Sequence, residues 1–310
     1  MGENILDLAI LRCPLSGQPL EQRGDRLVTK DGEQSYPIDE HGIPQFVRAF
    51  RSSDAAVQQE LFDGIGSAYV AHLNYPQTIA YTRYLDDVLL AEIGDRDLGV
   101  VVEACCGGGE SRRALGARIK RCIGIDVSLA MLRSARKNEA SRGFTYLQAD
   151  ATKTPLADAC ADTVLCLGGI HHVPDRAALF AEFARILKPG GRLYYREPLS
   201  DFVVWRWLRS LVYRLAPALD SVTEQPLRWR ETVPVLEQAG LVHLRWRPAG
   251  FIGFCLFMNS DVLIVNRLFR FVPGIRAVVE GFARFDDWVV RQPALARLGL
   301  QVIGVAARPA

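Results

Sequence analysis

The sequence feature that most constrains the fold is the stretch 100–110, VVVEACCGGGE, in which an apolar run leads directly into three consecutive glycines. Three β-branched residues in a row suit a strand that is buried on both faces of a parallel sheet, and glycines let the following turn approach a ligand closely. The spacing matches neither the dinucleotide pattern G-x-G-x-x-G nor the phosphate-binding loop that ends in Lys and Ser or Thr. The stretch therefore predicts a nucleotide-binding strand, turn and helix for a ligand other than NAD or ATP.

An acidic residue precedes the glycines, and this pattern resembles the first motif of class I S-adenosylmethionine-dependent methyltransferases, acidic-x-Gly-x-Gly-x-Gly. Cys105 and Cys106 stand where that family most often has glycine and then cysteine, so the motif is altered. A tight turn between buried elements would explain the loop alone, and the downstream sequence is what argues for the motif. The resemblance implies an S-adenosylmethionine cofactor and these contacts: Glu103, Ala104, Cys105, Gly107 and Gly109.

Two further strand ends carry acids at the spacing of the same family. Asp126 lies at the end of the strand expected within the apolar segment 122–127. A carboxylate at such a strand end can accept both hydroxyls of an adenosyl ribose. Ser128 is expected to cap a helix over 129–142. A third strand, 144–147, runs into Asp150, and the resemblance implies that this acid and its neighbour hold the adenine. The implied contacts along these strands are Asp126, Val127, Asp150, Ala151 and Leu167.

The order of elements continues to match this family as far as residue 200. A fourth strand over 162–169 is followed by a turn and a helix over 176–187, which Lys188-Pro189-Gly190-Gly191 stops because Pro and paired Gly cannot continue it. This tetrad is characteristic of small-molecule methyltransferases of the ubiquinone-biosynthesis type. The resemblance implies an α/β fold, a Rossmann-like seven-stranded, mostly parallel sheet, in a methyltransferase domain over 98–310.

Composition limits the class of protein. The chain has 310 residues, of which 49% are hydrophobic, enough for one large domain with additions or for two domains. Its formal net charge of +2 creates no strong field, so no nucleic-acid partner is favoured. Seven cysteines without small-domain spacing predict reduced thiols and a cytoplasmic setting. The most apolar stretch, 251–265, is interrupted by Asn259 and Asp261, so no transmembrane segment is expected.

Residues 1–50 form a separate small β unit, within which 11–50 is similar to the zinc-ribbon domain that precedes some rRNA guanine methyltransferases and recurs as a methyltransferase-activating subunit. The family pattern Cys-Pro-x-Cys-Gly reads here as Cys13-Pro14-Leu15-Ser16-Gly17, so the second cysteine is missing. One thiolate and the distant His41 cannot make a four-coordinate zinc site. We therefore expect the shape of the ribbon without its metal.

Residues 51–97 carry apolar side chains at helical spacing, which predicts two or three cap helices before the first strand. The resemblance implies that they cross the cofactor and form one wall of the substrate pocket. Tyr69 is the candidate for a cofactor-binding and catalytic hydroxyl near the methionine end. The alternative is that Tyr69 packs in the core with its hydroxyl at the surface.

Two segments outside the minimal fold, 201–225 and 249–299, are rich in Phe, Leu and Trp. Their composition predicts helical lid insertions over an apolar or aromatic substrate, with a homodimer face as the alternative. Residues 205–214 read as an amphipathic basic helix that serves a membrane surface, a lid or a partner.

Methyl transfer from a sulfonium is an in-line displacement, so the protein chiefly positions, desolvates and deprotonates the acceptor. His171 follows the fourth strand and is the candidate general base, against a structural role in the turn, which is the role expected of His172. The predicted function is methylation of a small apolar or aromatic metabolite, on oxygen rather than nitrogen or carbon. The alternatives are an RNA base methyltransferase, suggested by the ribbon, and a non-catalytic scaffold.

Overall fold

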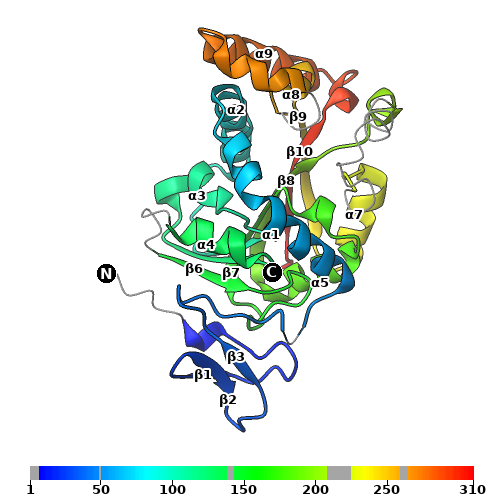
Figure 1. Cartoon of the computed structure of the whole chain (residues 1–310). Helices are drawn as coiled ribbons and strands as arrows, with labels where there is room; N and C mark the ends of the chain where they lie inside the picture. The colour runs from blue at the N-terminus through cyan, green and yellow to red at the C-terminus, as the bar shows by residue number, and fades with distance from the viewer. Residues whose placement is uncertain (1–6, 49, 138–142, 208–224, 259–263) are drawn as a thin grey trace.

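The computed structural model describes residues 7–48, 50–137, 143–207, 225–258 and 264–310. A seven-stranded sheet with the order β6-β5-β4-β7-β8-β10-β9 forms its centre, and only β10 runs antiparallel to its neighbours (Figure 1). This arrangement confirms the predicted fold class. The strands are β4 (Val100–Ala104), β5 (Arg121–Asp126), β6 (Phe144–Gln148), β7 (Ala161–Leu167), β8 (Leu187–Pro198), β9 (Val242–Ala249) and β10 (Gln301–Ala307).

Both faces of the sheet are covered. Since successive side chains of a strand point to opposite sides, each strand contributes to a core on either face. Val102 lies in one core with α5 (Arg176–Ile186) and α7 (Trp229–Gln238). Val101 lies in the other core, to which five further α-helices contribute described residues. These are α2 (Pro76–Ile93), α3 (Glu110–Leu115), α4 (Leu129–Lys137), α8 (Ile252–Phe257) and α9 (Ile275–Arg291).

The Lys-Pro-Gly-Gly tetrad follows the end of a helix, as predicted. It forms a bulge within a strand and not a separate turn. Helix α5 ends at Ile186 and β8 begins at the next residue. Pairing of β8 with β7 then jumps from Leu187 to Arg192 while β7 advances from Ala161 to Thr163. Gly190 takes a φ of +75° in the bulge, a conformation that glycine adopts without steric cost.

The N-terminal unit is a three-stranded antiparallel sheet attached to the edge of the large one. It contains η1 (Leu8–Ile10), β1 (Leu20–Arg23), β2 (Arg26–Thr29) and β3 (Ser35–Pro37). The amide N of Phe46 donates to the Gln148 carbonyl at 2.7 Å, and the amide N of Gln148 donates to the Pro44 carbonyl at 2.9 Å. Tyr36 and Leu27 share the hydrophobic core of the large sheet, so the two sheets form one packed body.

The remaining cysteine of the ribbon pattern is engaged within the protein. Cys13 Sγ lies 2.9 Å from Tyr36 Oη and accepts a hydrogen bond from the Ser16 amide at 3.3 Å. Over the described ranges, no group of three or more His, Cys, Asp and Glu side chains is arranged to hold a metal ion. The absence of zinc stays a prediction.

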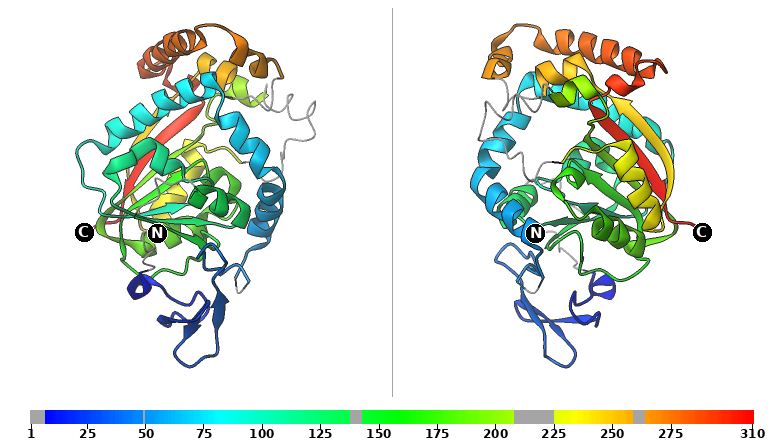
Figure 2. Two further views of the ribbon diagram at one scale, coloured as in Figure 1. Left: turned by 60° about the vertical axis from the view of Figure 1, so that its left-hand side comes forward. Right: turned by 90° about the vertical axis from the view of Figure 1, so that its right-hand side faces the viewer.

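The predicted cap helices are α1 (Ser53–Leu73) and α2, and the second insertion folds as α8 (Ile252–Phe257), η4 (Ile264–Phe271), α9 and η5 (Ala296–Leu298). The elements of the second insertion lie at the end of the molecule away from the N-terminal unit, with α2 against them, whereas α1 crosses the front of the sheet (Figures 1 and 2). Buried Asp286 joins α9 to α2 and to the residue before α8, because it accepts hydrogen bonds from Tyr81 Oη at 2.5 Å and from the Phe251 amide at 2.8 Å.

Most of the first insertion, 208–224, lies outside the described residues, and so does most of the amphipathic helix expected at 205–214. The part that the structure does describe includes a short helical segment over 203–207. The predicted helix over 129–142 is described as far as Lys137. Among the described helices, none combines the length and apolar character needed to cross a membrane.

Candidate active site

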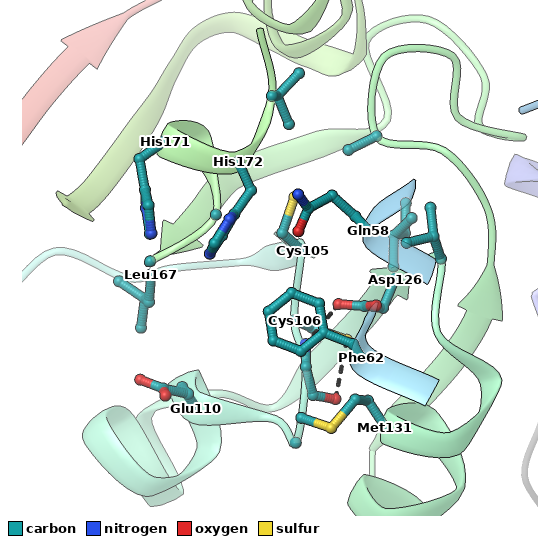
Figure 3. A pocket seen from close by; sticks show the side chains of 18 of the residues that line it. Gln58, Phe62, Cys105, Cys106, Glu110, Asp126, Met131, Leu167, His171 and His172 are labelled. Carbon is teal, nitrogen blue, oxygen red and sulfur yellow. Dashed lines mark hydrogen bonds between the residues drawn. The ribbon is translucent and has the colours of Figure 1, made fainter. Parts of the chain in front are cut away.

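A cavity of about 1110 Å³ lies at the carboxyl ends of the parallel strands, beneath α1 and α2 (Figure 3). Open α/β sheets bind their ligands at this edge. The volume is slightly above the roughly 300–1,000 Å³ of ordinary ligand sites, which leaves room for a nucleoside cofactor and a second molecule. The loops after β4, β5, β6 and β7 all contribute to its lining.

The glycine loop after β4 has the backbone that the methyltransferase motif requires. Cys105, Gly107 and Gly109 have φ values of +53°, +49° and +82°. A left-handed conformation costs a residue with a side chain roughly 1–2 kcal/mol, which explains why related sequences place glycine at these alternate positions. Cys105 replaces a glycine of the motif but keeps the left-handed backbone conformation. All three residues line the cavity.

Asp126, at the end of β5, has hydrogen-bonding capacity left for a ligand. Its carboxylate accepts bonds from the Gly107 amide at 2.8 Å and from the Ser128 amide at 2.9 Å. A carboxylate offers about four acceptor positions, so about two remain for the hydroxyls of a ribose. Burial raises the pKa of this carboxyl, and the backbone amides of Ser128, Gly107 and Val127 oppose that rise.

Asp150 lines the cavity, but its acceptor positions are already occupied. One oxygen accepts bonds from the Ser52 amide and hydroxyl at 2.9 and 2.7 Å, and the other from the Thr152 amide and hydroxyl at 2.8 and 2.7 Å. Ser52 also receives the Ala55 amide at 3.2 Å in the first turn of α1. Asp150 therefore anchors α1 to the sheet, and a bond to an adenine amino group would have to displace one of these donors.

Glu103 supports the loop from behind the cavity. Its side chain accepts bonds from the Ser111 amide and hydroxyl, both at 2.7 Å, and burial raises its pKa to about 7. Neither Glu103 nor Ala104 is among the residues that line the cavity. Their direct contact with a cofactor stays a prediction, and the structure supports an indirect role in fixing α3 against β4.

The remaining predicted contacts fall into two groups. Val127, Ala151 and Leu167 line the cavity as expected. Tyr69 lies on α1, but its side chain is outside the described part of the chain. Its proposed role near the methionine end therefore stays a prediction.

Gln58 is a cavity residue that the sequence analysis missed. It projects from α1 (Figure 3), and its side chain is only 6% exposed. Neither its amide nitrogen nor its amide oxygen has a hydrogen-bond partner among the described residues. A buried amide without partners is costly, so Gln58 is suited to bond a bound molecule. Its position one helical turn before Phe62, which also lines the cavity, was the available signal.

Replacing Gln58 with Leu should weaken cofactor binding about twofold to tenfold, because one neutral hydrogen bond of roughly 0.5–1.5 kcal/mol is lost. The ligand-free variant should unfold at the same or a higher temperature, since an unsatisfied buried amide is removed. Calorimetry and thermal denaturation measure both quantities. Gln59→Leu, one residue along the same helix, is the matched control, and equal loss of affinity in both variants would contradict the assignment.

His171 is positioned by a carboxylate that the sequence analysis also missed. Its Nδ1 lies 2.7 Å from an oxygen of Glu197, a residue at the end of β8 with no exposed surface. Glu197 also accepts the amides of Gly169 at 2.8 Å and Ile170 at 2.9 Å. An ionised carboxylate only accepts, so Nδ1 carries the proton and Nε2 is left as a proton acceptor. The available signal in the sequence was that Glu197 is a charged residue at the end of an apolar strand.

His172 packs rather than pairs with this carboxylate. Its ring lies 3.9 Å from that of His171 and meets the ring of Phe62 edge-on at 5.5 Å, both measured between centroids. This packing supports the structural role expected for His172.

A charged network lies beside the two histidines. Arg196 of β8, 7% exposed, bonds Asp86 of α2 at 2.6 Å and Glu110 of α3 at 2.7 Å. Arg113 also pairs with Asp86, and all four residues line the cavity. Because each carboxylate has an arginine, the network joins α2, α3 and β8 without leaving an unpaired charge in this group.

Comparison with known proteins identifies the family. The family described as "Methyltransferase domain" matches residues 102–195. A demethylmenaquinone methyltransferase from Thermobifida fusca is 32% identical over 224 residues, which make up 66% of this chain and 94% of that protein. This chain belongs to the class I S-adenosylmethionine-dependent methyltransferases.

Further relatives agree. The Syntrophotalea carbinolica protein named ubiquinone/menaquinone biosynthesis C-methyltransferase UbiE is 30% identical over 207 residues, 60% of this methyltransferase and 86% of that protein. Among solved structures, a putative sarcosine dimethylglycine methyltransferase from Galdieria sulphuraria aligns with a TM-score of 0.53 at 15% identity, covering 73% of this chain and 85% of that one. A chain from a Haloferax volcanii complex between the Trm112 methyltransferase activator and a putative methyltransferase aligns with a TM-score of 0.54 at 19% identity. The alignment covers 81% of this chain and 97% of that one.

The methyltransferase uses S-adenosylmethionine and acts on a small molecule. The cavity fits that cofactor on three observations: the left-handed glycine loop, the unfilled acceptor positions of Asp126 and the unpartnered amide of Gln58. S-adenosylmethionine supplies an electrophilic methyl group. What this chain must add is a positioned acceptor and, for an oxygen or carbon acceptor, a base.

Proposed function

We propose that this methyltransferase transfers a methyl group to a ring carbon of a lipophilic hydroxylated aromatic, a quinol. The observation that carries the proposal is His171, held by buried Glu197 with Nε2 left to accept a proton, in a cavity that also has an apolar wall. The names of the relatives, a demethylmenaquinone methyltransferase and a C-methyltransferase, support a quinol and a carbon acceptor. They do not support the O-methylation expected from the sequence, and neither RNA methylation nor a scaffold role is favoured.

The apolar wall comes from the second insertion and the helix beneath it. Phe254 and Met258 line the cavity beside Ile79 and Thr82 of α2, and Thr82 Oγ1 lies 3.6 Å from Met258 Sδ. Such a wall suits an aromatic ring and the start of an apolar tail. Among the described residues of 249–299, these two are the contribution to the cavity lining, so the lid prediction is supported for only a small part of the segment that the structure describes.

The residues of the chain suggest how the proton moves. His171 Nε2 takes the proton of the ring hydroxyl, and the electron pair released raises the nucleophilicity of the neighbouring ring carbon. As that carbon forms its bond to the methyl group, the methyl group's bond to the sulfonium would break with the electron pair left on sulfur, and Glu197 stabilises the imidazolium through Nδ1–H. Loss of the proton from the methylated carbon restores the aromatic ring, the hydroxyl is reprotonated, and one proton in total is released to water.

The test is to incubate the purified protein with cofactor carrying an isotope-labelled methyl group and a reduced quinone. We expect a labelled product whose methyl group is bonded to carbon by nuclear magnetic resonance. The oxidised quinone should not react, because it lacks the hydroxyl whose proton His171 removes. A methyl ether as the main product would overturn the choice of carbon, and no product from any quinol would overturn the substrate class.

Phe254→Ala should raise KM for the quinol roughly tenfold, because it removes apolar contact with the substrate ring, while leaving cofactor affinity unchanged. Steady-state kinetics and calorimetry separate the two effects. Phe285→Ala, which removes an exposed phenylalanine from the same insertion, is the control. An unchanged KM for Phe254→Ala would remove this wall from the substrate site.

A further inference from the structure

The outer surface of the second insertion is apolar where it faces away from the protein. Six large apolar side chains on η4, α9 and the turn between them are each at least 42% exposed, and we call them the outer face: Leu268, Phe271, Val272, Val278, Phe285 and Trp288. The three on α9 share one side of the helix, and the rings of Phe285 and Trp288 lie 6.2 Å apart. The opposite side of α9 packs into the core through Val279 and Ala283. Large apolar side chains that gather at the surface in this way mark an interaction site.

The segment that carries the outer face has an excess of positive charge. Five exposed arginines occur in it, at 267, 270, 276, 284 and 291, although Arg276 lies on the Val279 side of α9. Of its acids, Asp286 is buried and Asp287 pairs with Arg247 and Arg291, so the four other arginines are opposed by one exposed acid, Glu280. Arg284 and Arg291 lie one turn to either side of Trp288 along α9. Aromatic rings beside arginines are typical of a helix that lies at a membrane interface.

The outer face and the cavity lie on opposite sides of one helical layer. Phe257 of α8 packs against Phe269 of η4 at 5.4 Å and Phe282 of α9 at 5.5 Å, between ring centroids. The same short helix presents Phe254 to the cavity. Figure 2 shows this layer capping the end of the molecule away from the N-terminal sheet.

We propose that the outer face docks on an anionic lipid surface, with the rings of Phe285 and Trp288 at headgroup level and the arginines against the lipid charges. Docking brings the α8 layer, and with it the cavity, next to the bilayer in which a lipophilic substrate dissolves. That consequence rests on the proposed function, whereas docking itself does not. A second copy of the chain fits less well, since a two-fold contact through this face sets its arginines against the same arginines.

The experiment is co-sedimentation of the full chain with vesicles of phosphatidylglycerol and phosphatidylcholine, compared with phosphatidylcholine alone. We expect binding to the anionic vesicles that weakens as salt is added. The double variant Phe285→Ser, Trp288→Ser and the double variant Arg284→Glu, Arg291→Glu should each bind about tenfold more weakly. Leu244→Ser on β9, similarly exposed but outside the outer face, should bind like the wild type.

Three results would overturn the proposal: equal binding to both vesicle types, unchanged binding of the double variants, or a dimer in solution that either double variant abolishes. Activity on a short-tailed, water-soluble quinol without vesicles should be the same in the Phe285→Ser, Trp288→Ser variant as in the wild type. If vesicles bind but no quinol is methylated, the proposed function fails and docking stands. If quinols are methylated but vesicles do not bind, docking alone fails.

Discussion

Replacing His171 with Ala is expected to lower kcat by a factor of about 10²–10⁴, the usual contribution of a positioned general base. Cofactor affinity should change little, because the imidazole acts on the acceptor. Single-turnover kinetics, with calorimetry for the cofactor, measures both quantities.

His172→Ala is the matched control for this variant. Its ring packs on Phe62, whereas Glu197 holds the ring of His171, so we expect a smaller loss of rate. The assignment fails if His172→Ala loses more activity than His171→Ala. Glu197→Gln should fall between the two, because the amide nitrogen that replaces one carboxylate oxygen cannot accept a hydrogen bond from His171 Nδ1–H.

Replacing Asp126 with Ala should weaken cofactor binding by roughly 1.5–3 kcal/mol, about tenfold to 150-fold in Kd, the range for hydrogen bonds to a charged group. S-adenosylhomocysteine has the same ribose, so its Kd should rise by the same factor. Calorimetry with both ligands checks the result. An unchanged Kd would show that the ribose does not lie at Asp126.

Asp126 also accepts a hydrogen bond from the Gly107 amide, so its replacement could act through the loop and not through the ribose. A second variant separates these two effects. Glu103→Gln disturbs the same loop from behind, at a residue outside the cavity. It should lower the unfolding temperature and change Kd much less than Asp126→Ala. If both variants weaken binding equally, the effect of Asp126→Ala belongs to the loop and not to the ribose.

The parts of the site that follow from local backbone preference were predictable. The glycine loop needs left-handed φ angles at alternate positions, and its sequence pattern reports this directly even with Cys105 in one of them. The acid at the end of β5 follows from strand length and the position of the next helix. These features depend on residues within about one strand–turn–helix unit, where hydrophobic period and turn chemistry decide the structure.

Pairs that join distant segments were not predictable. Glu197 reaches His171 because β7 and β8 are parallel neighbours with Leu167 opposite Arg196. The Ser52–Asp150 contact, across 98 positions, places α1 over the cavity and so brings in Gln58. Neither partner is marked by a motif, since a buried carboxylate or amide differs from an exposed one only through its surroundings.

Composition identified the second insertion as apolar, but not the direction in which its side chains point. Phe254 lines the cavity, Phe257 is buried in the core, and Trp288 is 59% exposed at the surface. The sequence by itself determined the parallel sheet, the cofactor loop and the acid of β5, because each results from local periodicity and backbone conformation. The tertiary structure alone decided which aromatic side chains face the substrate, the core or the outside, because the burial of a side chain depends on what packs against it.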